Sequence, residues 1–133
     1  MISGDGKGLA VADLNDDGWA DLIATRNNAS ILVFRNRGHE DGNALSVTLR
    51  GSAQNPGAIG ARVELVLKDG STQVAEVTAG NGYLSQSSAT SFFGYRRDNL
   101  PRDVNVTWPN GTTTTHPIPE GSRRILIEAP DPL

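Results

Sequence analysis

Cysteine is absent from the 133 residues. A chain without cysteine forms no disulfide, holds no zinc through thiolates and offers no thiol nucleophile. Long apolar runs are also missing, since none approaches the roughly 18 residues that a membrane-spanning helix needs. The first residues lack the charged start and hydrophobic centre of a signal peptide. Any bound metal ion would therefore use oxygen ligands or one of the two histidines.

Basic clusters are equally scarce. The net charge is −3, and lysine and arginine form no run longer than the pairs Arg96-Arg97 and Arg123-Arg124. Proteins that follow a phosphate backbone carry a stripe of cations. We therefore predict neither nucleic-acid binding nor direct membrane insertion. Met1 is followed closely by the glycine-rich segment 4–8, and we expect the chain to be a fragment of a larger protein.

Glycine is plentiful, with fifteen residues, and the seven prolines are scattered. This composition favours many short strands joined by turns. Two-residue hairpin turns are expected at Asp69-Gly70 and Asn110-Gly111, because apolar residues recur at period two on both sides of the first and β-branched residues flank the second. The strands expected outside these hairpins cover residues 9–12, 22–25, 31–34, 45–49, 91–93 and 124–128.

The sequence predicts an all-β fold, a β-sandwich or a partly open barrel, preceded by a blade-like unit of three strands. We place a boundary in the polar segment 36–43, which separates an N-terminal unit, residues 1–38, from a β domain, residues 43–128. The residues expected inside the β domain are Val63, Leu65, Leu67, Val104, Val106, Trp108, Ile125 and Ile127.

A possible calcium site lies between the first two expected strands. From Asp13 to Asp21 the chain places Asp13, Asn15, Asp17 and Asp21 at positions one, three, five and nine, with glycine at position six. Calcium takes six to eight oxygen ligands, and the backbone carbonyl of Trp19 at position seven would add another. We therefore expect these five residues to hold calcium.

Two other interpretations of this loop are an EF-hand and a turn without a metal. An EF-hand would carry a bidentate glutamate at position twelve, but Ala24 stands there, and strands rather than helices flank the loop. A turn rich in Asp, Asn and Gly can also link two strands through side-chain-to-backbone hydrogen bonds without a metal. The spacing favours calcium over the bare turn.

Residues 6–38 resemble an FG-GAP or VCBS repeat. The likeness is carried by the strand 9–12, the loop 13–21, Leu22-Ile23 and the closing segment 32–38. In that family such loops bind calcium, and the repeats form blades of β-propellers. A single blade can neither bury both faces nor close a ring. The resemblance therefore implies either that further blades are missing or that this blade packs on the domain that follows.

Residues 43–128 resemble an ASPIC/UnbV domain of the cartilage acidic protein-like family. The matching stretches are Asn55-Pro-Gly-Ala-Ile-Gly-Ala-Arg-Val63, Ala79-Gly-Asn-Gly-Tyr-Leu-Ser-Gln86, Phe93-Gly94 and Trp108-Pro-Asn-Gly111. The sequence departs from the family pattern at Tyr95. The resemblance implies an exported protein with a role in extracellular adhesion or matrix interaction, and it supplies no catalytic residue.

Catalysis is not expected. Ser85 lies in a glycine-rich segment, and His39 or His116 would complete a hydrolase triad with an aspartate. However, Leu84-Ser85-Gln86 is not the G-x-S-x-G nucleophile elbow, and nothing in the sequence brings a histidine to it.

The leading hypothesis is a non-catalytic extracellular calcium-binding module that interacts with a protein or a glycan. The alternative is a carbohydrate-binding accessory module, which would present aromatic residues around Trp19, Tyr83 or Tyr95. Tyr83 and Gln86 are the candidate ligand-binding residues.

Overall fold

The computed structural model describes residues 5–82 and 85–130, and these residues form ten β-strands and no helix. The absence of a helix means that this part of the chain contains no long apolar helix that would cross a membrane. The strands are β1 Gly6–Ala12, β2 Asp21–Arg26, β3 Ala29–Phe34, β4 Gly42–Arg50, β5 Arg62–Leu67, β6 Thr72–Glu76, β7 Ser91–Arg96, β8 Pro101–Thr107, β9 Thr113–Pro117 and β10 Arg124–Glu128.

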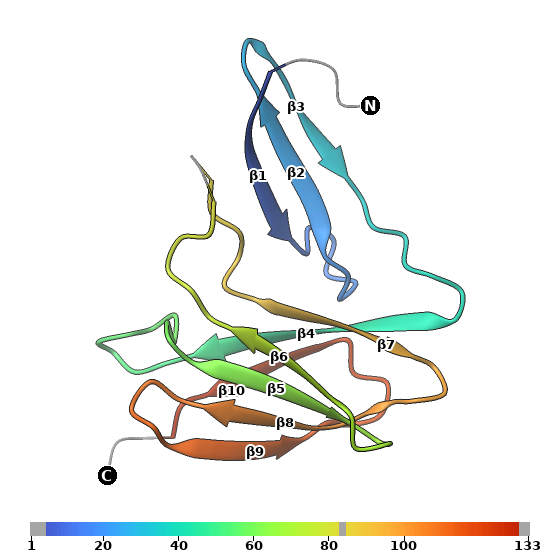
Figure 1. Ribbon diagram of the computed structural model, residues 1–133, viewed down its shortest axis with the longest axis vertical. Coiled ribbons are helices and arrows are strands. Elements are labelled where there is room, and N and C mark those ends of the chain that lie inside the picture. The colour runs from blue at the N-terminus through green and yellow to red at the C-terminus, as the bar shows by residue number, and fades with distance from the viewer. Residues whose placement is uncertain (1–4, 83–84, 131–133) are drawn as a thin grey trace.

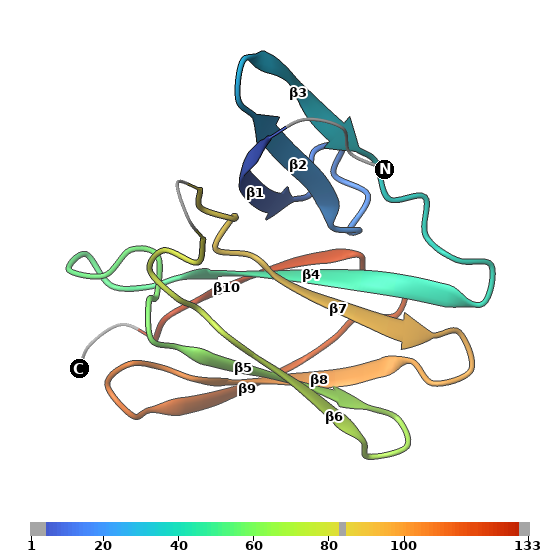
Figure 2. The ribbon, with the colours of Figure 1, turned by 45° about the horizontal axis from the view of Figure 1, so that its top comes forward.

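The strands form three sheets (Figure 1). β1, β2 and β3 make an antiparallel N-terminal sheet. β4 lies between β10, its parallel neighbour, and β7, its antiparallel neighbour. The third sheet is antiparallel throughout, in the order β6-β5-β8-β9. Figure 2 shows the second and third sheets facing each other as the two layers of a sandwich, with the N-terminal sheet standing on the outside of the β10-β4-β7 layer.

The sandwich core lies between these two layers. Val63 and Leu65 on β5 and Val104 and Val106 on β8 are fully buried, and across from them Leu45 on β4 is buried as well. Alternate residues of a strand point to opposite faces, so this period of two sends one set of side chains inward from each sheet. The outward set on the β6-β5-β8-β9 sheet is largely polar: the Asn105 amide donates to Glu64, and its oxygen accepts a hydrogen bond from Thr115.

The all-β prediction and the sandwich form of it are confirmed, and the sheets do not close into a barrel. Both hairpin turns fall where expected, between β5 and β6 and between β8 and β9. Of the eight expected core residues seven are buried, and Ile125 is partly buried against the same cluster. The sequence prediction omitted the contribution of β4 and β7, whose Leu45, Val47 and Phe93 belong to the core.

Candidate metal site

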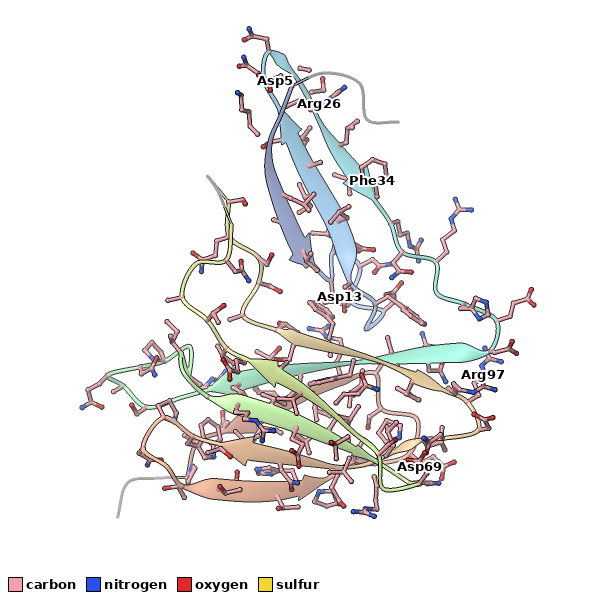
Figure 3. The ribbon with its side chains drawn as sticks, in the orientation of Figure 1. Asp5, Asp13, Arg26, Phe34, Asp69 and Arg97 are labelled. Atoms are coloured by element: carbon pink, nitrogen blue, oxygen red, sulfur yellow. The ribbon has the colours of Figure 1, made fainter. Side chains whose placement is uncertain are left out.

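The loop between β1 and β2 is held in a tight curl by the carboxylate of Asp13. Its Oδ1 accepts the N–H of Asp17 at 3.1 Å, and its Oδ2 accepts the N–H of Gly18 at 2.9 Å. Gly18 has a φ of 87°, in the left-handed region that favours glycine. The first aspartate of the predicted set therefore organises the backbone that carries the others, and Figure 3 shows it at the base of the N-terminal sheet, facing the sandwich.

Asp21 closes the loop at its other end. It is 2% exposed, and its Oδ2 accepts the N–H of Leu14 at 3.0 Å. Its Oδ1 accepts the N–H of Asn36 at 2.8 Å, and the Asn36 side chain donates to the Ala20 carbonyl at 3.3 Å. A buried carboxylate is stable only with such partners. Asp21 thus ties the start of the loop to the segment that follows β3.

Asp17 lies between these two carboxylates in sequence, and its surroundings change its pKa. Burial raises its pKa, but hydrogen bonds from the Trp19 N–H at 2.9 Å and the Asn15 amide at 2.8 Å, together with Arg35 at 3.5 Å, outweigh this effect. The pKa of Asp17 is therefore lower than that of an ordinary aspartate. The loop keeps this carboxyl group ionised at neutral pH.

The loop sits directly on the start of β10. A Cβ added to Gly18 would lie 2.7 Å from the Arg123 carbonyl oxygen, so glycine is required there for close approach as well as for φ. That same carbonyl accepts the N–H of Ser46 on β4 at 2.9 Å. Beside it, the Arg124 guanidinium pairs with Asp16 at 2.6 Å. The loop therefore contacts the sandwich where β10 and β4 begin to pair.

Trp19 packs against the linker that joins the two units. A Cβ on Gly38, whose φ is 70°, would come within 2.8 Å of the indole ring, and Gly42 at the start of β4 also lies close to the ring. The indole is therefore partly covered by the linker. This arrangement does not offer Trp19 as an open aromatic platform of the kind that the carbohydrate-binding alternative requires.

A second contact joins the N-terminal sheet to the sandwich at the outer edge of β1. The Val11 N–H donates to Ser87 Oγ at 3.1 Å, and the Val11 carbonyl accepts the N–H of Ser88 at 3.0 Å. Gln86 next to this contact is exposed. The other candidate ligand-binding residue, Tyr83, lies outside the described residues.

All five residues predicted to hold calcium lie in the single loop between β1 and β2. The carboxylates among them do not converge on one point in the way that a cluster of metal ligands would. Within residues 5–82 and 85–130, no three His, Cys, Asp or Glu side chains are grouped so as to hold an ion. The loop carboxylates instead receive backbone and side-chain N–H groups. The residues named for calcium therefore stay a prediction.

Ser85 and the two histidines lie on separate parts of the fold. The His116 ring on β9 pairs with Thr114 Oγ1 at 2.9 Å, and His39 Nδ1 accepts the N–H of Asp41 at 3.2 Å. Neither ring makes a hydrogen bond with Ser85 among the described residues.

Sequence reasoning missed the residues that anchor the loop from outside it. The backbone N–H of Asn36 donates to Asp21. Gly18 lies against the carbonyl of Arg123, and Asp16 forms an ion pair with Arg124. A local signal for Asn36 was present, because an asparagine just past the end of a strand commonly forms local hydrogen bonds. No local signal connects residues 16–18 with residues 123–124, which are more than a hundred positions away.

The fold and this junction define a class of all-β module in which a β-sandwich carries a small additional sheet. Residues 51–132 match the family described as ASPIC and UnbV, and the chain belongs to this family. Similar proteins are the cartilage acidic protein 1 of Xenopus tropicalis, of Homo sapiens and of Mus musculus. Each is 30% identical over an alignment of 128 positions that covers 94% of this chain. The chain spans about one fifth of the length of these relatives.

Proposed function

We propose that this chain is a non-catalytic structural and interaction module of a larger exported protein, with calcium as the ion that fixes its two units to each other. The observation that carries the proposal is the position of the Asp13–Asp21 loop. This short segment joins β1 to β2, and its Asp21 accepts a hydrogen bond from Asn36 in the linker. Its Gly18 lies against the carbonyl of Arg123. An ion that stiffens this loop would therefore stiffen the whole junction.

The residues at the loop fit a calcium ion in their chemistry. Calcium prefers carboxylate, amide and carbonyl oxygens. The carboxylates of Asp13, Asp17 and Asp21 each have lone pairs beyond the hydrogen bonds described above, because a carboxylate offers about four. Asn15 would contribute its Oδ1. The Trp19 carbonyl accepts no hydrogen bond from the described residues, and it would complete the set.

The charge of the loop also supports a cation. Four carboxylates lie within the nine residues 13–21, and three of them belong to the proposed ligand set. The nearby Arg35 is 3.5 Å from Asp17 and largely exposed, so it neutralises only part of that charge. Arg124 pairs with Asp16, which is not in the proposed ligand set. Calcium would supply the remaining positive charge and remove the repulsion among the three aspartates.

An extracellular location is consistent with this type of site. The relatives are named for cartilage, and the resemblance to the cartilage acidic protein-like family implies export. Calcium loops of extracellular modules have dissociation constants of about 10⁻⁴ to 10⁻³ M, which suits millimolar calcium outside cells. The proposed partner is a protein or glycan.

Thermal melting with and without calcium tests the proposal. Calcium at 100 times its dissociation constant should stabilise the folded chain by about 2.7 kcal/mol and raise the melting temperature, because it binds the folded state only. Asp17→Asn should abolish the shift. The matched control is Asp41→Asn, which removes an exposed carboxylate outside the loop and should leave the shift intact. A wild-type melting curve that ignores calcium, or an equal response to magnesium, would contradict the proposal.

A further inference from the structure

A cavity of about 690 Å³ lies at one end of the sandwich, far in sequence from the Asp13 loop. Its wall comes from the loop between β4 and β5, the turn between β8 and β9, and the segment that follows β10. These three segments meet at the left-hand end of the sandwich in Figure 1. The volume is within the range of about 300–1,000 Å³ that is usual for small-ligand sites. No residue of the N-terminal sheet lines it.

The loop between β4 and β5 gives the cavity a rigid wall. The Asn55 amide donates to the Ile59 carbonyl at 2.8 Å, and its oxygen accepts the Ile59 N–H at 3.0 Å. Ala58 between them is fully buried and has a φ of 52°, a left-handed conformation that is unfavourable for a residue with a Cβ. Such a conformation persists only where the surrounding bonds enforce it, and it is common at ligand-binding sites.

The turn between β8 and β9 fixes the opposite wall. Trp108 is 3% exposed, and its indole Nε1 donates to Thr114 Oγ1 at 2.9 Å. The Asn110 Oδ1 accepts the Thr112 N–H at 3.0 Å, which leaves the amide hydrogens of Asn110 for another acceptor. Both walls are therefore preformed, and a ligand would lose little free energy to ordering them.

The lining combines an apolar floor with a neutral polar rim. The floor exposes Pro109, Ala129 and Pro130 and rests on the buried Ala58 and Trp108. The rim is formed by the amides and hydroxyls of Ser52, Gln54, Asn110 and Thr112. Within residues 5–82 and 85–130, no ionisable side chain lines the cavity. Among the described residues, the side chains of Ser52 and Gln54 make no hydrogen bond, so both are available to a ligand. A charged ligand would lose hydration here without gaining a counter-ion.

We propose that this cavity binds a neutral saccharide. Amide and hydroxyl groups both donate and accept hydrogen bonds, and the hydroxyl groups of a sugar do the same. The C–H face of a sugar ring would lie on the apolar floor. An extended peptide fits less well, because all the lining residues lie outside the strands, so the cavity itself presents no strand edge for a peptide to pair with. A proline-rich peptide would need exposed aromatic rings, and Trp108 is buried.

This site is independent of the proposed calcium loop and differs from the position first considered for a carbohydrate, around Trp19, Tyr83 and Tyr95. The test is an NMR titration of the ¹⁵N-labelled chain with glucose, galactose, mannose and N-acetylglucosamine. Glucuronic acid serves as the charged counterpart, and a proline-rich peptide as the other ligand class. At least one neutral sugar should shift the Trp108 indole signal and the amides of residues 51–58 in a saturable way.

Two substitutions locate the binding. Gln54→Glu and Asn110→Asp each replace an amide donor by a carboxylate, and Asn110→Asp keeps the oxygen that accepts the Thr112 N–H. Each should weaken sugar binding about fivefold or more, because a hydrogen bond is lost and an unpaired charge gained. Asn27→Asp makes the same chemical change in the exposed turn between β2 and β3, outside the cavity, and should have no effect.

The proposal is overturned if none of the four neutral sugars produces saturable shifts at the cavity. It is also overturned if glucuronic acid or the peptide binds more tightly than every neutral sugar. The same holds if Gln54→Glu and Asn110→Asp change the affinity no more than Asn27→Asp does. Both cavity substitutions are at exposed positions, so the variants should fold, and their amide spectra verify this directly.

Discussion

In the sandwich, fourteen buried apolar residues form one cluster, whereas in the N-terminal sheet Ala24 is the one buried apolar residue among those that the structure describes. Leu9, Ile31, Val33 and Phe34 in that sheet are all between 43% and 62% exposed. The register places Leu9 and Phe34 on one face and Ile31 and Val33 on the other. The sheet is therefore apolar on both faces.

This difference shows where each unit obtains its stability. The sandwich buries its inward side chains between two layers and presents a polar network, including Glu64 and Asn105, to solvent. Three strands with two open faces bury too little surface to be stable alone. The N-terminal sheet therefore depends on the Asp13–Asp21 loop, on the contact of Val11 with residues 87–88, and on any surface that covers its faces in a larger protein.

The largest expected effect comes from truncating equivalent leucines in the two units. Leu65→Ala removes a fully buried side chain and should lower the free energy of unfolding by about 2–5 kcal/mol. Leu9→Ala removes a side chain that is 52% exposed and should cost no more than about 0.5 kcal/mol in the isolated chain. Urea unfolding followed by circular dichroism measures both. Equal losses of unfolding free energy would contradict the conclusion that only the sandwich obtains its stability from buried apolar side chains.

A smaller effect is expected at the contact between the units. Gly18→Ala should cost about 1–3 kcal/mol more than Gly70→Ala, because both glycines have a φ near 86° but only Gly18 lies against a backbone carbonyl. Around Gly70 the space is open, so that variant reports the backbone penalty alone. The urea concentrations at the unfolding midpoints of the two variants are compared. Identical midpoints would show that Gly18 is not in close contact with the Arg123 carbonyl.

The smallest effect is a dependence on acid. Because the pKa of Asp17 is below its ordinary value, its contribution to stability is complete above about pH 4 and is lost as the pH falls through the lowered value. The pKa of Asp69 is lowered as well, by hydrogen bonds from the Ser71 hydroxyl and N–H. Without calcium, Asp17→Asn should reduce the loss of stability of the N-terminal sheet as the pH falls. Asp69→Asn should do the same for the sandwich. Melting curves of the two variants between pH 3 and pH 6 distinguish these effects. If the melting temperature of Asp17→Asn falls with acid as steeply as that of the wild type, Asp17 does not contribute in this way.

Much of the fold was predictable because local rules specify it. The Asp69-Gly70 and Asn110-Gly111 turns and the alternation along β5 and β8 led directly to the hairpins and to most of the core. The parallel pairing of β4 with β10 had no such signal, because residues about eighty positions apart carry no local mark of their contact. The cavity was equally invisible, since it forms from three loops that only the closed sandwich brings together.

For the candidate site, the spacing of Asp13, Asn15, Asp17 and Asp21 was sufficient to identify the loop but not its surroundings. Gly18 was expected to permit a sharp turn, and the structure gives it a second role in the approach to Arg123. The partner of Asp21 likewise comes from beyond β3, where Asn36 follows the sheet. Contacts of this kind depend on how the units pack, and this packing is not encoded in the loop.

The central proposal is that calcium makes the Asp13–Asp21 loop a stable joint between the sandwich and the N-terminal sheet. Hydrogen–deuterium exchange of the wild-type chain, with calcium and with a chelator, tests it most directly. Calcium should slow exchange at residues 6–36 by tenfold or more and leave β5 and β8 nearly unchanged, since a tenfold change corresponds to about 1.4 kcal/mol of local stability. Exchange that calcium leaves unaltered, or slows equally in both units, would contradict the claim.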